Sequence, residues 1–160
     1  MTTTTTPALT AQDVWRAVSR RSFAVISHVT PAGEPRSSGV LYAVADGRMY
    51  IAVERDGWKA RHIAAHGTVA VTVPIRRGGL LALLLPIPPA TVSFTAVAVV
   101  HPGTFLDGMP RLAALLPPER RAECAVVEVR PTGRYVTYGL GVPLLAMRET
   151  ARARARIPVG

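Results

Sequence analysis

The chain has 160 residues, of which 49% are hydrophobic and 18% charged, so it can form one domain with a substantial core and is not a disordered protein. Its formal net charge is +9, but the basic residues are scattered and no aromatic residues interleave with them, which argues against nucleic-acid binding. Cys124 is the single cysteine, which excludes an intrachain disulfide and a cysteine-based metal site.

The first residues form a threonine-rich run, and we expect residues 1–9 to be a flexible tail. They lack the basic start and apolar centre of a signal peptide. The most apolar stretch, residues 79–89, is too short to span a bilayer. The sequence therefore predicts a cytoplasmic protein without a membrane span.

The first half of the domain is predicted to be a helix followed by a three-stranded meander. Thr10 is expected to cap a helix over residues 11–20, with Asp13 in its first turn. Strands are predicted over residues 22–29, 35–44 and 48–54, with turns at 30–34 and 45–47. A short helix over residues 58–66 ends at Gly67, and the β-branched run 68–75 predicts a strand buried on both faces.

The second half begins with an insertion over residues 76–89, followed by a predicted strand over 91–101 and a helix over 107–116 that Pro117 breaks. Strands are then predicted over residues 123–130 and 134–138, and a helix over 144–156. The fold class is mainly β with a few helices, as a closed or partly closed antiparallel barrel. One domain is expected over residues 10–143, with a C-terminal helix or tail over 144–160.

Catalytic motifs are scarce. There is no nucleophile elbow, no Walker loop and no obvious acid–base pair. His62 and His66 lie four residues apart on a predicted helix, but the intervening glutamate of the metalloprotease motif is absent, so a polar helix face is expected and no metal site.

The strongest candidate site is the junction over residues 54–62, where a strand leads into a short helix. Free backbone N–H groups and the helix dipole favour an anion there. Arg55, Lys59 and Arg61 add cationic side chains suited to phosphate, and Lys59 is the only lysine in the chain. Trp58 offers a flat apolar face beside a ligand; the alternative is a solvated basic helix start with Trp58 in the core.

In order and spacing, the segments AGEPR at 32–36, DGRMYI at 46–51, WKARHI at 58–63 and YVTYG at 135–139 resemble the pyridoxamine 5′-phosphate oxidase-like, FMN-binding split-barrel proteins. Within this family the chain is most similar to the flavin/deazaflavin (F420)-dependent oxidoreductases. The resemblance covers residues 14–139. It implies an antiparallel split β-barrel that forms a homodimer, with two cofactor sites at the subunit interface.

The resemblance also implies roles for individual residues. Lys59 falls on the phosphate-binding lysine of the family, and Arg61 on a second basic position. Tyr138 and Gly139 would approach the cofactor from near the subunit interface. The strands that flank the isoalloxazine ring and ribityl chain carry Ser38, Gly39, Val40, Ala52 and Val53.

Two departures leave the cofactor open between FMN and F420. Gly57 stands where relatives often carry an arginine, for which Arg55 is a candidate substitute. Ala52 and Val53 lack the hydroxyl groups that some FMN enzymes present.

The implied function is an oxidoreductase that transfers hydride between this cofactor and a small organic substrate. One alternative is a non-catalytic flavin or F420 carrier or sensor. A second is a haem-binding split barrel with His28, His62 or His101 as ligand, and a third is an anion-binding interaction protein without a cofactor. The segment 79–89 is expected to be an apolar lid or substrate wall, or a surface loop packed on the partner subunit.

Overall fold

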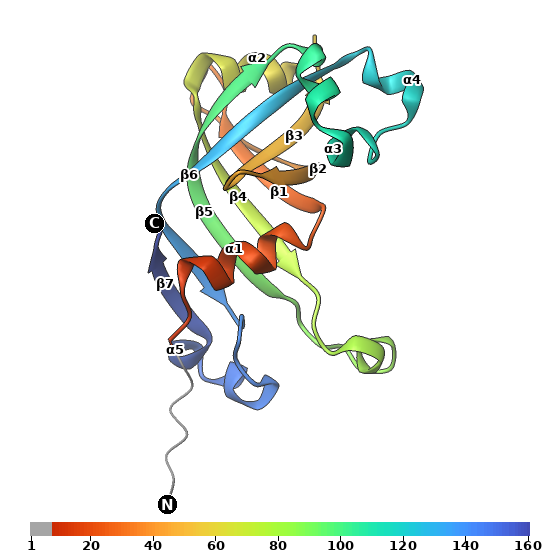
Figure 1. The fold of residues 1–160 in the computed structure, drawn as a ribbon. Coiled ribbons are helices and arrows are strands. Elements are labelled where there is room, and N and C mark those ends of the chain that lie inside the picture. Colours follow the sequence, from red (N-terminus) through yellow and green to blue (C-terminus); the bar gives the residue numbers. More distant parts are fainter. Residues whose placement is uncertain (1–7) are drawn as a thin grey trace, which may run out of the picture.

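Six antiparallel strands close into a barrel in the computed structural model, which describes residues 8–160 (Figure 1). The sheet order is β3-β2-β1-β4-β5-β6-β7, and pairing of β3 with β6 closes the ring while β7 extends the far half of β6. The strands are β1 (Phe23–Val29), β2 (Pro35–Ala45), β3 (Arg48–Glu54), β4 (Thr68–Ile75), β5 (Ala90–His101), β6 (Cys124–Tyr138) and β7 (Arg154–Pro158). The predicted antiparallel split barrel is confirmed; the homodimer stays a prediction. Most of the expected tail, residues 1–7, lies outside the described residues.

The predicted N-terminal helix is α1 (Ala11–Ser19). The Thr10 side chain accepts from the backbone N–H of Asp13, whose carboxylate accepts from the backbone N–H of Thr10, so the two residues form a capping box. Val14 and Val18 are fully buried against the barrel. The buried hydroxyl of Tyr42 on β2 donates to the carbonyl oxygen of Val18 at 2.6 Å, which ties the end of α1 to the sheet.

The local turn signals are also confirmed. Asp46 and Gly47 adopt φ values of 49° and 71° in the β2–β3 hairpin, as a tight primed turn requires. Helix α2 (Trp58–His66) ends at Gly67 in the left-handed conformation. The prediction that β4 is buried on both faces is wrong. Its exposure alternates, because the barrel has only one interior and the opposite face of β4 lies at the outer surface.

The second half differs more from the prediction. Strand β6 is continuous, because a register shift against β5 between Ser93 and Thr95, with Gly133 at φ 70°, carries the strand through the region expected to be a turn. The predicted helix over residues 107–116 is divided into η2 (Gly103–Gly108) and α3 (Pro110–Ala113), followed by α4 (Pro118–Arg121). The insertion contains the 3₁₀ helix η1 (Gly79–Leu83).

The predicted C-terminal helix over residues 144–156 is wrong. The segment contains η3 (Leu144–Arg148), α5 (Thr150–Ala153) and strand β7. Ile157 of β7 is buried against the main core, and the neighbouring Arg156 and Pro158 are exposed, so pairing with β6 outweighs the helical propensity of the Ala-Arg repeat. Within residues 8–160, no helix is both long and apolar enough to cross a membrane.

The main core fills the barrel with small and branched aliphatic side chains from every barrel strand. A second, smaller cluster lies outside the barrel wall, where η2 and α3 cover β3 and β6. It contains Tyr50, Leu106, Leu112 and Val126. The segment between β5 and β6 is therefore anchored on the outer surface of the β3–β6 seam.

A buried ionic cluster crosses this seam. The carboxylate of Glu128 on β6 is only 3% exposed, and it accepts hydrogen bonds from Arg48 of β3 at 2.8 Å and from Arg130 at 2.7 Å. His101 of β5 lies 2.8 Å from the other carboxylate oxygen and stacks on Phe105. Burial alone would raise the pKa of Glu128, but the hydrogen bonds and charges of these partners outweigh it and hold the pKa below its usual value. One carboxylate thus joins side chains of three neighbouring strands of the barrel, β3, β6 and β5.

We expect Glu128→Gln to lower the free energy of unfolding by about 1–3 kcal/mol, because Arg48 and Arg130 lose the buried carboxylate that accepts their hydrogen bonds. Urea unfolding at neutral pH measures this change. The control is Glu34→Gln, which removes an exposed 3.1 Å ion pair with Arg36 and should cost less than about 1 kcal/mol. Equal effects of the two substitutions would contradict a special role for the Glu128 cluster.

Candidate functional site

The predicted basic junction lies where β3 ends and α2 begins, at one end of the barrel (Figure 1). Gly57 is the N-cap residue, and no side chain caps the helix. The first turn of α2 also contains no acidic residue, in contrast to the capped start of α1. The exposed backbone donors and positive dipole end of α2 are therefore left for another acceptor.

Lys59 lies in the first turn of α2 and is partly buried. Its Nζ lies 5.8 Å from the centroid of the Trp58 ring, and within residues 8–160 no carboxylate oxygen comes within ion-pair distance of it. Burial lowers the pKa of this ammonium group. A partly desolvated cation without an anionic partner is a favourable position for a ligand anion.

Arg55 and Arg61 flank Lys59 in the sequence. Arg61 donates to the backbone oxygen of Asp56 at 2.9 Å, and the Nε of Arg55 lies 3.5 Å from the Asp56 carboxylate. Both arginines are exposed. The structure therefore brings together three of the predicted basic residues and Trp58, whose ring is partly exposed and outside the core.

An aromatic and polar cluster lies between α2 and the end of β1. The ring centroid of His28 is 5.4 Å from that of Trp58 and 5.5 Å from that of His62. Both ring nitrogens of His28, Nδ1 of His62 and Oγ of Ser38 are buried and have no hydrogen-bond partner among the described residues. Sequence reasoning paired His62 with His66; the structure pairs it with His28, which faces the barrel interior at the end of β1.

Burial lowers the pKa of His28, and the neighbouring charges of His62, Lys59 and Arg36 lower it further. The imidazole is only 3% exposed, so its protonated form is poorly solvated.

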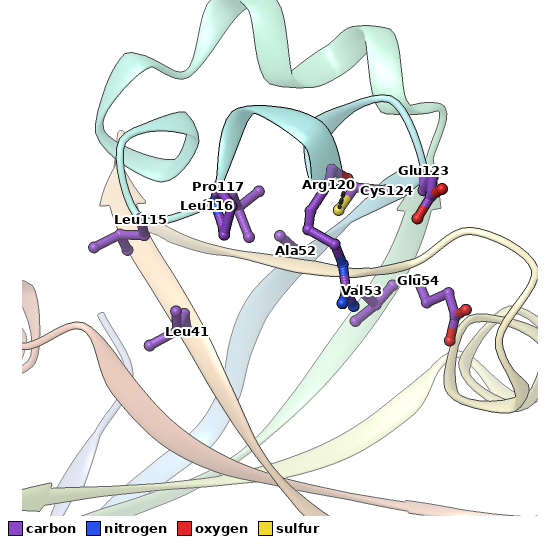
Figure 2. A pocket seen from close by; sticks show the side chains of 10 residues that line it. All are labelled: Leu41, Ala52, Val53, Glu54, Leu115, Leu116, Pro117, Arg120, Glu123 and Cys124. Carbon is purple, nitrogen blue, oxygen red and sulfur yellow. Dashed lines mark hydrogen bonds between the residues drawn. The ribbon is translucent and has the colours of Figure 1, made fainter.

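A pocket of about 230 Å³ opens on the outer side of β2 and β3, under the α3–α4 segment (Figure 2). Leu41, Ala52 and Val53 come from the two strands, and Leu115, Leu116 and Pro117 from the covering segment. Arg120, Glu123 and Cys124 complete the lining together with Glu54, which is the last residue of β3 before the α2 junction. An apolar cleft therefore lies close in the chain to the basic helix start.

The strand residues predicted as cofactor neighbours divide between the two sides of the barrel wall. Ala52 and Val53 line the pocket, although most of Val53 is buried in the main core. Val40 is buried in that core and Ser38 is partly buried on the same face. Gly39 lies on the outer face, where an added Cβ would come within 2.8 Å of the Phe23 ring.

Gly57 has a steric reason to lack a side chain. An added Cβ would lie 3.2 Å from both Cβ and the backbone oxygen of Glu54. The arginine that the sequence resemblance would place here would need this turn to shift, which leaves Lys59, Arg55 and Arg61 as the basic groups of the junction.

Tyr138 and Gly139 are not brought to this site within one chain. Cys124, at the start of β6, pairs with Glu54 near α2, whereas Tyr138 ends the 15-residue strand opposite Thr91. The Tyr138 hydroxyl donates to the Met147 oxygen at 3.4 Å, and Met147 packs on Gly139. A role for these two residues in cofactor binding would require a partner subunit and stays a prediction.

Sequence reasoning missed the lining contributed by Leu41 and by the segment 115–124. Pro117 and Pro118 marked a helix break but gave no sign that the chain folds back over β2 and β3. Cys124, interpreted as a small apolar strand residue, is indeed buried, and its thiol donates to the backbone oxygen of Arg120 at 3.1 Å.

Metal ions and haem are the other ligands to consider. No group of three or more His, Cys, Asp or Glu side chains within residues 8–160 lies close enough to hold a metal ion. Of the three histidines considered as haem ligands, none lines the pocket of Figure 2, and His101 is bound to Glu128 through Nε2.

We expect His28 to make stability depend on pH. Because its folded pKa is lowered, the unfolded chain binds the extra proton first as pH falls below about 6.5, so the stability present above that pH is lost as pH falls through the folded pKa. Urea unfolding between pH 7.5 and 5 should show a loss that His28→Leu reduces. The control is replacement of the exposed His66 by alanine; His28→Leu retaining the full pH dependence would contradict this assignment.

No protein-family model matches the sequence, and no curated protein matches it as a relative. Solved structures do match. An F420 reductase is 19% identical, with a TM-score of 0.58 over 79% of this chain and 95% of its own. A candidate pyridoxamine 5′-phosphate oxidase from Listeria innocua is 10% identical, with a TM-score of 0.58 over 76% and 92%. A haem-binding protein from Mycobacterium smegmatis is 16% identical, with a TM-score of 0.64 over 83% of this chain and 55% of its own. The chain therefore has the split-barrel fold of the pyridoxamine 5′-phosphate oxidase-like proteins, as the sequence resemblance predicted.

Proposed function

We propose that this protein binds a phosphorylated flavin-type cofactor, FMN or F420, and acts as an oxidoreductase on a small organic substrate in the cytoplasm. The observation that carries the proposal is Lys59, a partly buried ammonium group with no carboxylate partner in the described chain, at the start of a helix with no capping side chain. Solved split barrels that include an F420 reductase and a candidate pyridoxamine 5′-phosphate oxidase support it.

The residues at the junction fit a phosphate group. Lys59 supplies a compact charge, Arg55 and Arg61 supply planar forks, and the first turn of α2 supplies backbone donors. Two acids lie near this helix start: Asp56, which contacts Arg55, and Glu54, whose carboxylate lies beside Gly57. The same donor set serves the FMN phosphate and the anionic tail of F420. The net charge of +9 suits either ligand.

The pocket beside the junction fits part of a flat ring system. Leu41 and Ala52 form an apolar floor on the outer side of the strands, and Val53, mostly buried in the core, also contributes to the lining (Figure 2). Its volume of about 230 Å³ is below the roughly 300 Å³ at which small-molecule sites usually begin, which favours a site shared by two chains. A second copy of the chain would complete it, in the predicted homodimer.

The bound cofactor would supply the hydride chemistry. This chain would hold its phosphate at α2, orient its ring on the β2–β3 surface and exclude water beneath α3–α4. These roles need no acid–base pair from the protein. A chain that binds the cofactor but transfers hydride to no acceptor would be a carrier or sensor, the first alternative.

We expect Lys59→Ala to weaken FMN or F420 binding by about 1.5–3 kcal/mol, roughly tenfold to a hundredfold, because one charge-assisted phosphate contact is lost. Titration of each cofactor, followed by absorbance or fluorescence, measures the change. The matched control is Arg134→Ala, which removes one exposed positive charge from β6. If neither cofactor binds the parent, or if Lys59→Ala binds as tightly, the proposal fails; a Soret band on haem titration would then favour the haem-binding alternative.

A second variant tests the ring position. Leu41 is partly exposed at the pocket, so Leu41→Trp should fill the cleft with little change in stability. We expect cofactor affinity to fall at least about tenfold, since the apolar floor is covered. Thermal unfolding without cofactor verifies that the fold is intact. Unchanged affinity would place the ring elsewhere while leaving the phosphate site untouched.

A further inference from the structure

The loop between β4 and β5 presents a cluster of exposed leucines. Leu80, Leu83 and Leu84 are each more than 80% exposed, and Leu81 and Leu85 are more than half exposed. The loop, which includes η1, projects from the end of the barrel opposite α2 (Figure 1). Five exposed leucines within six residues are unusual for a surface loop. Exposed apolar patches of this kind mark interaction sites.

A second leucine-bearing segment lies at the same end. The 3₁₀ helix η3 carries Leu145, which is 80% exposed, next to the partly exposed Leu144 (Figure 1). Arg77 links the two segments, since its guanidinium group donates to the backbone oxygen of Val142 and contacts the Met147 sulfur. The two leucine segments are thus parts of one surface, which we call the leucine end.

Arginines surround the base of the leucine loop. Two adjoining grooves there are lined by Arg20, Arg21, Arg76 and Arg77, and neither lining contains a carboxylate. Arg21 donates to the backbone oxygen of Arg76 at 3.5 Å, which brings the end of α1 to the loop. The leucine end therefore combines protruding apolar tips with a basic collar.

We propose that the leucine end docks onto an anionic lipid membrane surface, with the leucines in the interfacial acyl region and the arginines on lipid phosphates. Anionic membrane surfaces bind protein segments in which apolar side chains are flanked by basic groups, and this binding needs no membrane-spanning helix. The 3₁₀ helices η1 and η3 have five residues each, so they would enter only the interfacial region of the bilayer and not its hydrocarbon core.

Charge argues for lipid over a second copy of this chain. A two-fold interface built from this surface would bring the arginine collars of both copies into one interface. No acid in the groove linings would compensate them, and like charges in contact disfavour such an interface. An anionic membrane satisfies the leucines and the arginines together.

Position argues against a role as a lid over the site of the same chain. The loop follows β4 at Ile75, opposite Ala90 and next to the Tyr138 end of β6. Lys59 and the pocket of Figure 2 are at the Cys124 end of the same strand. Within one chain the leucine end and the candidate cofactor site lie at opposite ends of β6, and the inference does not depend on the proposed function.

The test is co-sedimentation of the full chain with vesicles of phosphatidylcholine alone and with an equal mixture of phosphatidylcholine and phosphatidylserine. We expect binding at least about tenfold tighter to the anionic vesicles, weakening as salt is added. The double variant Leu83→Ser and Leu84→Ser should lose most of this binding. So should Arg20→Gln with Arg76→Gln, which leaves the leucines in place.

The matched control is Val97→Thr with Val99→Thr, which replaces two exposed apolar residues on the outer face of β5 and should bind like the parent. Absence of binding to anionic vesicles, or undiminished binding by the leucine variant, would overturn the proposal. Sedimentation velocity without lipid tests the alternative, in which a second copy of the chain binds this surface. If the leucine variant converts a dimer to a monomer, the surface is an interface between copies and the proposal is wrong.

Discussion

Strand β6 pairs with β3 and β5 along its first half, and this double pairing closes the barrel. Six residue pairs, from Met49 with Val129 to Glu54 with Cys124, satisfy the backbone groups that β3 would otherwise expose as a sheet edge. Glu128 lies within this seam and binds side chains from β3, β5 and β6, so closure is reinforced by charge as well as by the ladder. Beyond Val129, β6 leaves β3 and pairs with β7, and the barrel opens into its split end.

Closure also decides which side chains are free to bind a ligand. Along β2 and β3 the alternation of side chains places Val40 in the core and Leu41 and Ala52 outside. The outer residues would be an ordinary wet surface if the segment between β5 and β6 did not fold back over them. Its anchoring by Leu106 and Leu112 on the outer cluster holds α3 and α4 above the strands and makes a pocket.

Local signals allowed much of the fold to be predicted. The Thr10–Asp13 cap, the Asp46–Gly47 turn and the Gly67 stop each depend on a few neighbouring residues, so the sequence shows them directly. The continuity of β6 depends on a partner strand distant in the sequence. So does the formation of β7 over residues 154–158, where the predicted helix extended to residue 156. Local propensity favours other structures in both places. The basic residues at α2 were found for the same local reason. The His28–His62 pair and the 115–124 lining were not, since only the closed barrel brings them together.

The distribution of ion pairs gives the net charge of +9 a structural meaning. Five acids form ion pairs with arginines among the described residues: Asp13 with Arg16, Glu34 with Arg36, Asp56 with Arg55, Glu149 with Arg152, and Glu128 with Arg48 and Arg130. Lys59 at one end of the barrel and the arginine collar at the other have no such carboxylate among the described residues. Within residues 8–160, cationic groups without an ion-pair partner are therefore present at both ends of the barrel. A scattered basic composition becomes two separate anion-attracting surfaces, each beside apolar side chains, so each favours a ligand with both an anionic and an apolar part.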